Sequence, residues 1–227
     1  MNCPLSGDYI DIHTHGGTPS EGMFIVENLM AHEANEIPSA QGMAYTIGLH
    51  PWFFGDSDYE KPILKIKEFA AQNRIIAIGE AGFDKIRGAS PDLQRKVFEE
   101  QAIIAEEHRI PLIIHCVKGW DELLAAHKKL KPSVPWLIHG FHGKIETAKQ
   151  LLDRGMYLSI WYSFVLIPES SELIKFIPRD RLFLETDGAD VDIRDIYNKV
   201  SEDLKMNIED LKSGFLRNYF KFFNVKP

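Results

Sequence analysis

Short apolar runs alternate with stretches of helical spacing along most of the chain. The apolar runs predict about eight strands, at residues 9–15, 23–30, 42–51, 75–79, 111–115, 135–139, 156–160 and 181–185. Helices are predicted between the later strands, at residues 62–72, 91–108, 120–129, 144–154, 170–176 and 192–223. Residues 16–22 and 31–41 show no helical period, so the first crossover helices are expected to be trimmed.

Three local signals mark the ends of these helices. Ser90 precedes Pro91 and is expected to cap the helix that Pro91 opens. Asn207 is a candidate N-cap in the C-terminal region, and Gly155 is expected to end the helix of residues 144–154.

Alternating apolar strands and amphipathic helices are typical of a parallel sheet covered by helices. Eight strands suit a TIM-like (β/α) barrel better than an open sheet. A doubly wound sheet that binds nucleotides is less favoured, because the first strand lacks a Gly-x-Gly-x-x-Gly motif and no Walker-type loop occurs. We therefore expect an α/β fold, a somewhat distorted TIM-like barrel that forms a single domain over residues 1–227.

The composition indicates the class of protein and its compartment more clearly than it indicates the reaction. A hydrophobic content of 44% is ordinary for a globular domain, and no apolar run approaches the length of a membrane span. The first residues lack the layout of a signal peptide, and Cys3 and Cys116 do not make a disulfide framework, so a cytoplasmic protein is expected. The net charge of -7 argues against a nucleic acid partner, but two bound divalent ions would reverse the charge locally.

Residues of metal-ligating type lie at the ends of five of the predicted strands. They are His13, His15, Glu80, His115, His139 and Asp187. Singly, each has an ordinary explanation, such as a helix-capping carboxylate, a core histidine or an Asp-Gly turn. Together they indicate a metal site, because catalytic residues of barrels lie where the strands end. Four histidines and two carboxylates suit two divalent ions (Zn, Mn, Mg, Co or Ni) and indicate hydrolysis by an activated water.

Several segments in this order resemble the TatD-type metal-dependent deoxyribonucleases, a family of the amidohydrolase superfamily. They are Asp11-Ile-His-Thr-His15, Gly48-Leu-His-Pro51, Ala77-Ile-Gly-Glu-Ala-Gly-Phe-Asp84, Gln94-Arg-x-Val-Phe-x-x-Gln101, Pro111-Leu-Ile-Ile-His115, His139-Gly-Phe-x-Gly143 and Glu185-Thr-Asp187. The resemblance covers roughly residues 9–220 and implies a TIM-like barrel. It also implies His13, His15 and Asp187 on one ion, His115 and His139 on the other, and Glu80 as the bridge.

The chain departs from this family pattern around the expected ligands. Val117 and Lys118 follow Cys116 where the family usually carries an Arg, and His142 stands where a Ser is expected before Gly143. These differences concern the rim that would hold the substrate rather than the ligands.

Supporting roles are predicted for a few further residues. Asp187 is the candidate general base, and Glu80 is catalytic through the ions it would bridge. His50 is expected to support the site or to contact substrate, with a structural role as the alternative. Lys85, Arg87 and Lys118 are candidates for binding phosphate oxygens, although loop cations without a role are equally expected.

The sequence therefore predicts a divalent-metal-dependent hydrolase, and the family resemblance implies a phosphodiesterase of DNA. We expect a monomer with no membrane partner. Two alternatives stay open. One is a dinuclear-metal hydrolase of a small ester, lactone, amide or phosphomonoester, or of another anionic substrate. The other is a non-catalytic metal-binding scaffold.

Overall fold

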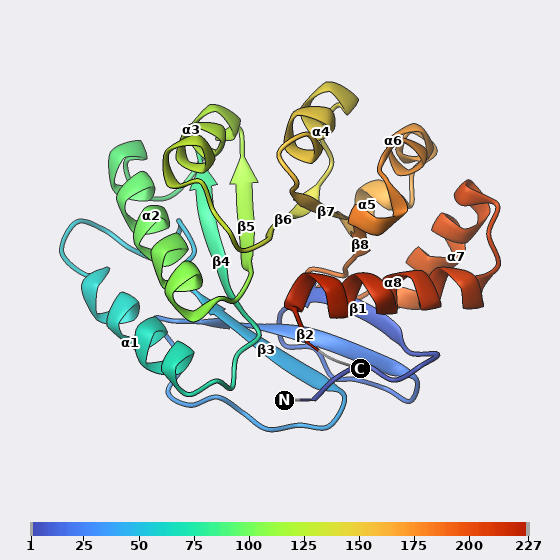
Figure 1. Ribbon diagram of the computed structural model, residues 1–227, viewed down its shortest axis with the longest axis horizontal. Coiled ribbons are helices and arrows are strands. Elements are labelled where there is room, and N and C mark those ends of the chain that lie inside the picture. The colour runs from blue at the N-terminus through green and yellow to red at the C-terminus, as the bar shows by residue number, and fades with distance from the viewer. Residues whose placement is uncertain (1, 226–227) are drawn as a thin grey trace. The chain divides into compact units, whose positions relative to one another are not determined.

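The computed structural model describes residues 2–225 and contains eight strands that follow one another in the sheet in sequence order (Figure 1). The strands are β1 (Tyr9–Thr14), β2 (Met23–Met30), β3 (Met43–Gly48), β4 (Ala77–Asp84), β5 (Leu112–Val117), β6 (Trp136–Phe141), β7 (Tyr157–Ile160) and β8 (Leu182–Leu184). The pairs β1–β2, β3–β4, β4–β5 and β7–β8 are parallel. The predicted number and order of strands are confirmed.

The helices lie where the amphipathic pattern predicted them. They are α1 (Glu60–Ala71), α2 (Pro91–His108), α3 (Trp120–Leu130), α4 (Ile145–Leu152), α5 (Tyr162–Val165), α6 (Ser170–Phe176), the 3-10 helix η1 (Arg179–Arg181), α7 (Ile193–Leu204) and α8 (Ile208–Phe223). No helix lies between β1 and β2 or between β2 and β3, so the trimmed crossovers are confirmed. The short α5 was not predicted, because four residues are too few to show a helical period.

The helix ends form as the local signals predicted. The Ser90 side chain accepts a hydrogen bond from the backbone N–H of Leu93 at 3.4 Å, and that of Asn207 accepts one from Asp210 at 2.7 Å. After α4, Gly155 takes a positive φ of 78° and donates its N–H to the Leu152 carbonyl at 2.8 Å.

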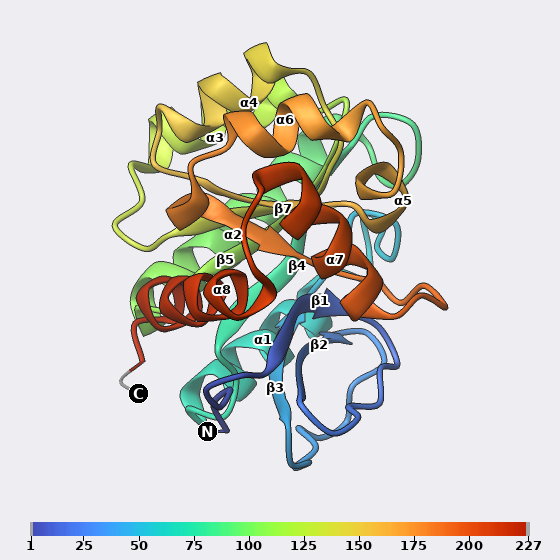
Figure 2. The ribbon, with the colours of Figure 1, turned by 90° about the vertical axis from the view of Figure 1, so that its right-hand side faces the viewer.

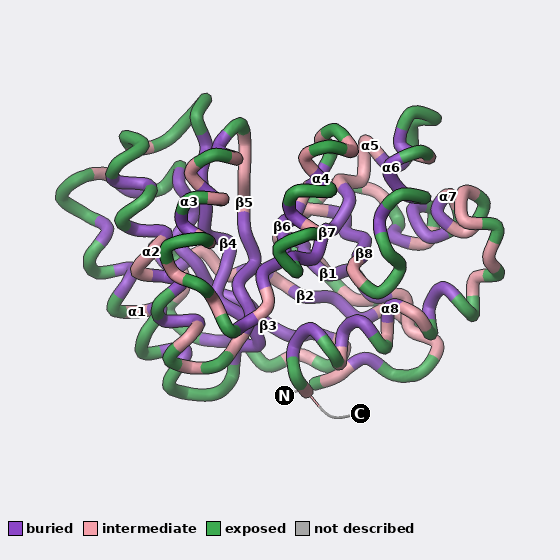
Figure 3. Tube along the Cα trace, turned by 45° about the horizontal axis from the view of Figure 1, so that its top comes forward, coloured by how far each residue is buried: buried purple, intermediate pink, exposed green. Residues whose placement is uncertain are grey.

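The described residues pack into two compact units, each built from separate segments of the chain. Unit 1 consists of Asn28–Ser39 and Tyr45–Leu137, and unit 2 of Asn2–Glu27, Ala40–Ala44 and residues 138–225. The strands of each unit are largely buried, whereas exposed residues are frequent on the helices (Figure 3). The single domain expected from the sequence stays a prediction.

In unit 1, β4 is buried along its whole length and lies beside β5. The two strands approach so closely that a Cβ added to Gly82 would lie 1.8 Å from the carbonyl oxygen of His115, its partner in the ladder. Only glycine can therefore occupy this position without moving the backbone. The close contact fixes the register that brings Glu80 of β4 near His115 of β5.

In unit 2, helices α7 and α8 lie against β1 (Figure 2). The buried Tyr197 of α7 donates its hydroxyl to the Ile10 carbonyl at 3.1 Å and accepts the Ile10 N–H at 2.9 Å. Burial raises the pKa of Tyr197, so the hydroxyl keeps its proton. This anchor holds the strand that carries His13.

One expectation about the ligand positions is wrong. The predicted strands end just before Glu80 or at His115 and His139, whereas β4, β5 and β6 continue beyond these residues. The apolar run ends at each of these residues, yet the backbone ladder continues beyond it, because a polar side chain that faces a site is compatible with strand pairing.

Among the described residues, no helix combines the length and apolar character needed to cross a membrane.

Candidate metal centre

Unit 2 brings together His13, His15 and Asp187, called here the unit-2 trio. The Nε2 atoms of His13 and His15 lie 3.8 and 3.7 Å from Oδ1 of Asp187. These separations exceed hydrogen-bonding distances. They suit donor atoms that share one ion, because bonds of about 2.1 Å place ligands at most ~4.2 Å apart. The unit-2 trio can therefore hold a divalent cation.

The local backbone aims Asp187 at β1. Its φ is 53°, a left-handed conformation that Asp tolerates better than most residues, and its N–H donates to the His13 carbonyl at 3.1 Å. Gly188 follows with a φ of 72°. The Asp-Gly turn considered as the ordinary explanation for Asp187 is thus present, and this turn presents the carboxylate to the histidines.

Asp11 secures the segment before Asp187, a role that the sequence did not reveal. The hydroxyl of Thr186 donates to Asp11 Oδ2 at 2.5 Å, and its backbone N–H donates to Oδ1 at 3.1 Å. Burial raises the pKa of Asp11 to about 7 against the lowering effect of these bonds. The only signal in the sequence is that Asp11 shares a strand face with His13 and His15.

Glu185 organises the surroundings of His139. This buried carboxylate accepts the Gly140 N–H at 2.6 Å and a short hydrogen bond from the Ser159 hydroxyl. Its Oε1 lies 3.6 Å from Nδ1 of His139. Burial raises the pKa of Glu185, but His139 and the other donors outweigh burial and lower it, so the group is an anion. The rings of His139 and His13 are 4.3 Å apart, which places His139 beside the unit-2 trio.

Unit 1 brings together His50, Glu80 and His115, called here the unit-1 trio. Oε1 of Glu80 lies 3.3 Å from Nε2 of His50 and 3.0 Å from Nδ1 of His115. Glu80 is 3% exposed, so its carboxylate is shielded from solvent. A buried carboxylate needs close donors or a cation, and both imidazoles face the same oxygen.

Asp84 determines which nitrogen of His115 faces Glu80. Its Oδ2 lies 3.3 Å from Nε2 of His115 and accepts the indole N–H of Trp52 at 2.7 Å. Burial raises the pKa of Asp84, but hydrogen bonds from Trp52 and two backbone N–H groups outweigh it and lower the pKa. An ionised Asp84 favours the proton on Nε2, so Nδ1 would offer its lone pair to an ion held between His115 and Glu80. This is the carboxylate–histidine arrangement that orients metal ligands.

In His50, by contrast with His115, the ring nitrogen that faces Glu80 is the one that carries the proton. Its Nδ1 accepts the backbone N–H of Trp52 at 3.2 Å, so in the neutral ring Nε2 carries the proton and points at Glu80. His50 is therefore better suited to holding the Glu80 carboxylate than to binding an ion.

The predicted phosphate-binding cations differ in their surroundings. Lys85 pairs with Glu122 at 2.9 Å, and this hydrogen bond raises the pKa of Lys85. Arg87 places its guanidinium 4.2 Å from the centre of the Trp52 ring, close to the unit-1 trio. Lys118 follows β5 with a φ of 56° and is exposed. Lys85 is thus engaged with a carboxylate, whereas Arg87 and Lys118 are exposed loop residues.

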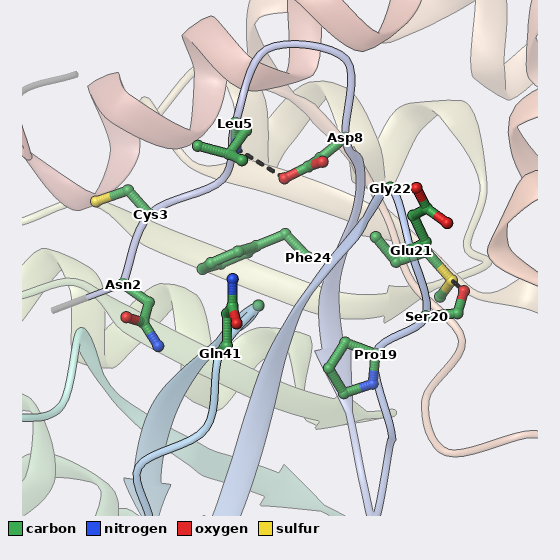
Figure 4. A pocket seen from close by; sticks show the side chains of 12 residues that line it. Asn2, Cys3, Leu5, Asp8, Pro19, Ser20, Glu21, Gly22, Phe24 and Gln41 are labelled. Carbon is green, nitrogen blue, oxygen red and sulfur yellow. Dashed lines mark hydrogen bonds between the residues drawn. The ribbon is translucent and has the colours of Figure 1, made fainter.

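A separate hollow of about 540 Å³ lies in unit 2, near the starts of β1 and β2 (Figure 4). It is lined by residues that include Asn2, Cys3, Pro19, Glu21 and Phe24. Sites of (β/α) barrels use the carboxyl ends of the strands, so this hollow is not part of the candidate metal centre.

Solved structures share this fold at low sequence identity. A TatD family hydrolase from Entamoeba histolytica superimposes with a TM-score of 0.79 and 18% identity, covering 96% of this chain and 98% of that chain. The TatD homologue YJJV from Escherichia coli gives 0.75 and 18%, covering 98% and 100%. An uncharacterized amidohydrolase from Saccharomyces cerevisiae gives 0.67 and 16%, covering 88% of each chain. The protein thus has the fold of a TIM-like (β/α) barrel, as predicted.

The family follows from the sequence match. Residues 22–224 match the family described as "TatD related DNase", and the chain belongs to this family. It is 34% identical to the uncharacterized metal-dependent hydrolase YabD of Bacillus subtilis over 62% of this chain and 56% of that protein. It is also 34% identical to the 3'-5' ssDNA/RNA exonuclease TatD of Salmonella typhimurium over 68% and 61%. The chain spans between about half and three fifths of the length of the curated relatives it matches.

Proposed function

We propose that the protein is a divalent-metal-dependent hydrolase that cleaves phosphodiester bonds in nucleic acid. The observation that carries the proposal is the arrangement of His115 between Asp84 and Glu80, which fits a metal ligand better than a core histidine. The unit-2 trio adds a second set of ligands of the same chemical type. Family membership and the name of the Salmonella relative support the choice of a nucleic acid substrate.

The ion content is part of the proposal. Two ions are proposed, chosen from Zn, Mn, Mg, Co and Ni, because six ligands exceed the needs of one tetrahedral ion. His13, His15 and Asp187 would hold one ion, His115 and His139 the other, and Glu80 would bridge them. Such ions supply an acidified water near neutral pH and neutralise the charge of the phosphate.

The residues themselves have distinct tasks in this proposal. The side chain of Asp187 is 28% exposed, so solvent reaches its carboxylate, which suits a general base. Glu80 is buried and held by His50, which suits a fixed ligand rather than a group that exchanges protons with water. Arg87 and Lys118 are proposed to bind the phosphate oxygens, since Lys85 is already paired with Glu122.

A small ester, lactone, amide or phosphomonoester is the second candidate substrate, because the net charge of -7 counts against a partner with many phosphates such as nucleic acid. The non-catalytic scaffold is less favoured, because the chain retains all six predicted ligands and a protein without activity has no evident need for a bridging glutamate. The monomeric state and the cytoplasmic location stay predictions.

The test uses metal-free protein loaded separately with Mg, Mn or Zn. Labelled single-stranded DNA, RNA, bis(p-nitrophenyl) phosphate and a panel of small esters are offered as substrates. We expect shortening of the oligonucleotides that stops with chelator and with His15→Ala. The control His108→Ala alters a histidine at the end of α2 that belongs to neither trio and should keep the activity. Turnover of esters without turnover of any phosphodiester would contradict the proposal.

A further inference from the structure

We propose that the surface formed by Trp52, Phe53, Ile86 and Arg87, here called the aromatic ledge, binds a base of a single-stranded nucleic acid beside the unit-1 trio. The inference rests on the proposed function and names a specificity determinant within it. It concerns how the substrate is held and not which residues carry the chemistry.

The aromatic ledge is built from two loops of unit 1 that are joined through their backbones. The N–H of Ala89 donates to the Pro51 carbonyl at 3.2 Å. A Cβ added to Gly88, whose φ is 103°, would lie 2.2 Å from the same carbonyl oxygen. Because this contact requires glycine, the loop of residues 85–90 is held closely against the loop that follows β3.

Trp52 lies at the centre of the aromatic ledge in a fixed orientation. Its indole N–H donates to Asp84 at 2.7 Å, and its ring centre lies 4.7 Å from that of His50 and 5.8 Å from that of His115. It is nevertheless 38% exposed. A group that contacts the Trp52 ring is therefore separated from His50 and His115 of the unit-1 trio by that ring alone.

Phe53 extends the surface beyond Trp52. Its ring lies 6.4 Å from that of Trp52 and stacks on His32 at 4.6 Å with an interplanar angle of 24°. Phe53 is 39% exposed and Ile86 is 67% exposed. Exposing three large apolar side chains in two joined loops is unfavourable in water, which indicates a surface used for binding.

The chemistry of the aromatic ledge fits a nucleotide. Bases stack on aromatic rings regardless of their identity, and an arginine nearby can contact the phosphate that accompanies each base. Arg87 has its guanidinium 4.2 Å from the centre of the Trp52 ring, which supplies the positive charge next to the apolar surface. A purely apolar partner would not require this cation, and a free phosphate would not require the rings.

The test compares substrates with and without bases. A single-stranded oligothymidine and a matched strand with abasic residues at its three terminal nucleotides, at either end, are cleaved by the metal-loaded protein. Wild-type protein should prefer the strand with bases by about 5- to 150-fold in kcat/KM, as expected from stacking of about 1–3 kcal/mol per base. Phe53→Ala should remove most of this preference through a higher KM rather than a lower kcat.

Two further variants make the outcome specific. Trp52→Phe loses the hydrogen bond to Asp84 but keeps an aromatic ring. Because of this ring, it should retain more of the preference for strands with bases than Trp52→Ala. Phe176→Ala removes an equally exposed phenylalanine from α6 of unit 2 and should leave the preference unchanged. Binding of a fluorescent oligothymidine to the metal-free protein, followed by anisotropy, should weaken with Phe53→Ala and not with Phe176→Ala.

The results separate this inference from the function on which it rests. If wild-type protein cleaves phosphodiesters but Phe53→Ala affects strands with and without bases equally, the aromatic ledge is not a base-binding surface. If wild-type protein cleaves esters and no phosphodiester, the proposed function fails first, and this inference fails with it.

Discussion

Replacement of Asp84 by Asn tests how the unit-1 trio is prepared for an ion. The change keeps the size of the side chain and the oxygen that accepts the N–H groups of Ile86 and Arg87. The introduced amide nitrogen, however, would take the place of Oδ2. It would lose the hydrogen bond from the Trp52 indole and would donate one to Nε2 of His115, where the carboxylate accepts one. The proton of the neutral imidazole would then move to Nδ1, which faces Glu80 at 3.0 Å. A protonated Nδ1 cannot bind an ion.

The size of the effect follows from the hydrogen bond that is lost. A hydrogen bond to a charged group is worth about 1.5–3 kcal/mol. The 3.3 Å separation between Asp84 and His115 is long for such a bond, which favours the lower part of this range. We therefore expect ion affinity to fall by about 10- to 30-fold, within the range of about 10–100-fold typical of residues that orient metal ligands.

Two measurements follow the change. Titration calorimetry with Mn or Zn gives the ion affinity, and long-range proton–nitrogen NMR spectra show which imidazole nitrogen of His115 carries the proton. Asp92→Asn is the matched control, because Asp92 is in the same unit and its side chain is 92% exposed. Wild-type ion affinity together with an unchanged tautomer in Asp84→Asn would refute the reasoning.

Three other changes test the site and the fold. Glu80→Gln removes the proposed bridging charge, so metal analysis should show the loss of one ion and turnover should fall by several orders of magnitude; retention of both ions with near-normal turnover would exclude the bridge. Gly82→Ala should lower the free energy of unfolding by at least about 3 kcal/mol, because the added methyl group meets the His115 carbonyl. The control Gly214→Ala in α8 should not destabilise the protein, and chemical denaturation compares the two variants. Glu106 accepts three hydrogen bonds from Ser133 and Val134, which lower its pKa despite partial burial. Glu106→Gln should therefore lower the free energy of unfolding by about 1 kcal/mol at neutral pH. Because the carboxylate stabilises the fold only while it is ionised, this difference from wild type should shrink as the pH falls through the lowered pKa of Glu106. A difference in the free energy of unfolding that stays constant with pH would contradict this.

The fold could be predicted from the sequence because its signals are local. The apolar run of residues 23–30 coincides with β2, and Ser90 with Pro91 marks the first turn of α2. The ends of β4, β5 and β6 could not be predicted, because hydrophobicity stops at the residue that faces the site while backbone pairing continues. The four residues of α5 are shorter than any pattern that could reveal them.

The candidate site was predictable only for residues whose type suggests a ligand. Asp84, Asp11 and Glu185 were not identified as site residues, because their roles depend on partners far away in the chain. Asp84 contacts a histidine 31 residues later, Glu185 contacts a backbone N–H 45 residues earlier, and Asp11 contacts a threonine 175 residues later. No periodicity within a segment can report such contacts.

The hydrogen bonds between Asp11 and Thr186 have a consequence for synthesis of the protein. At about 5–20 residues per second, the 175 residues between them take roughly 9 to 35 s to emerge from the ribosome. During this interval β1 lacks β8, and the unit-2 trio lacks Asp187, whereas residues 45–137 of unit 1 can already pack together. A protease should therefore cut near His13 in nascent chains stalled before residue 182 and should spare this strand in the released protein. The first histidines of the sequence can thus meet their carboxylate partner only after most of the chain has been synthesised.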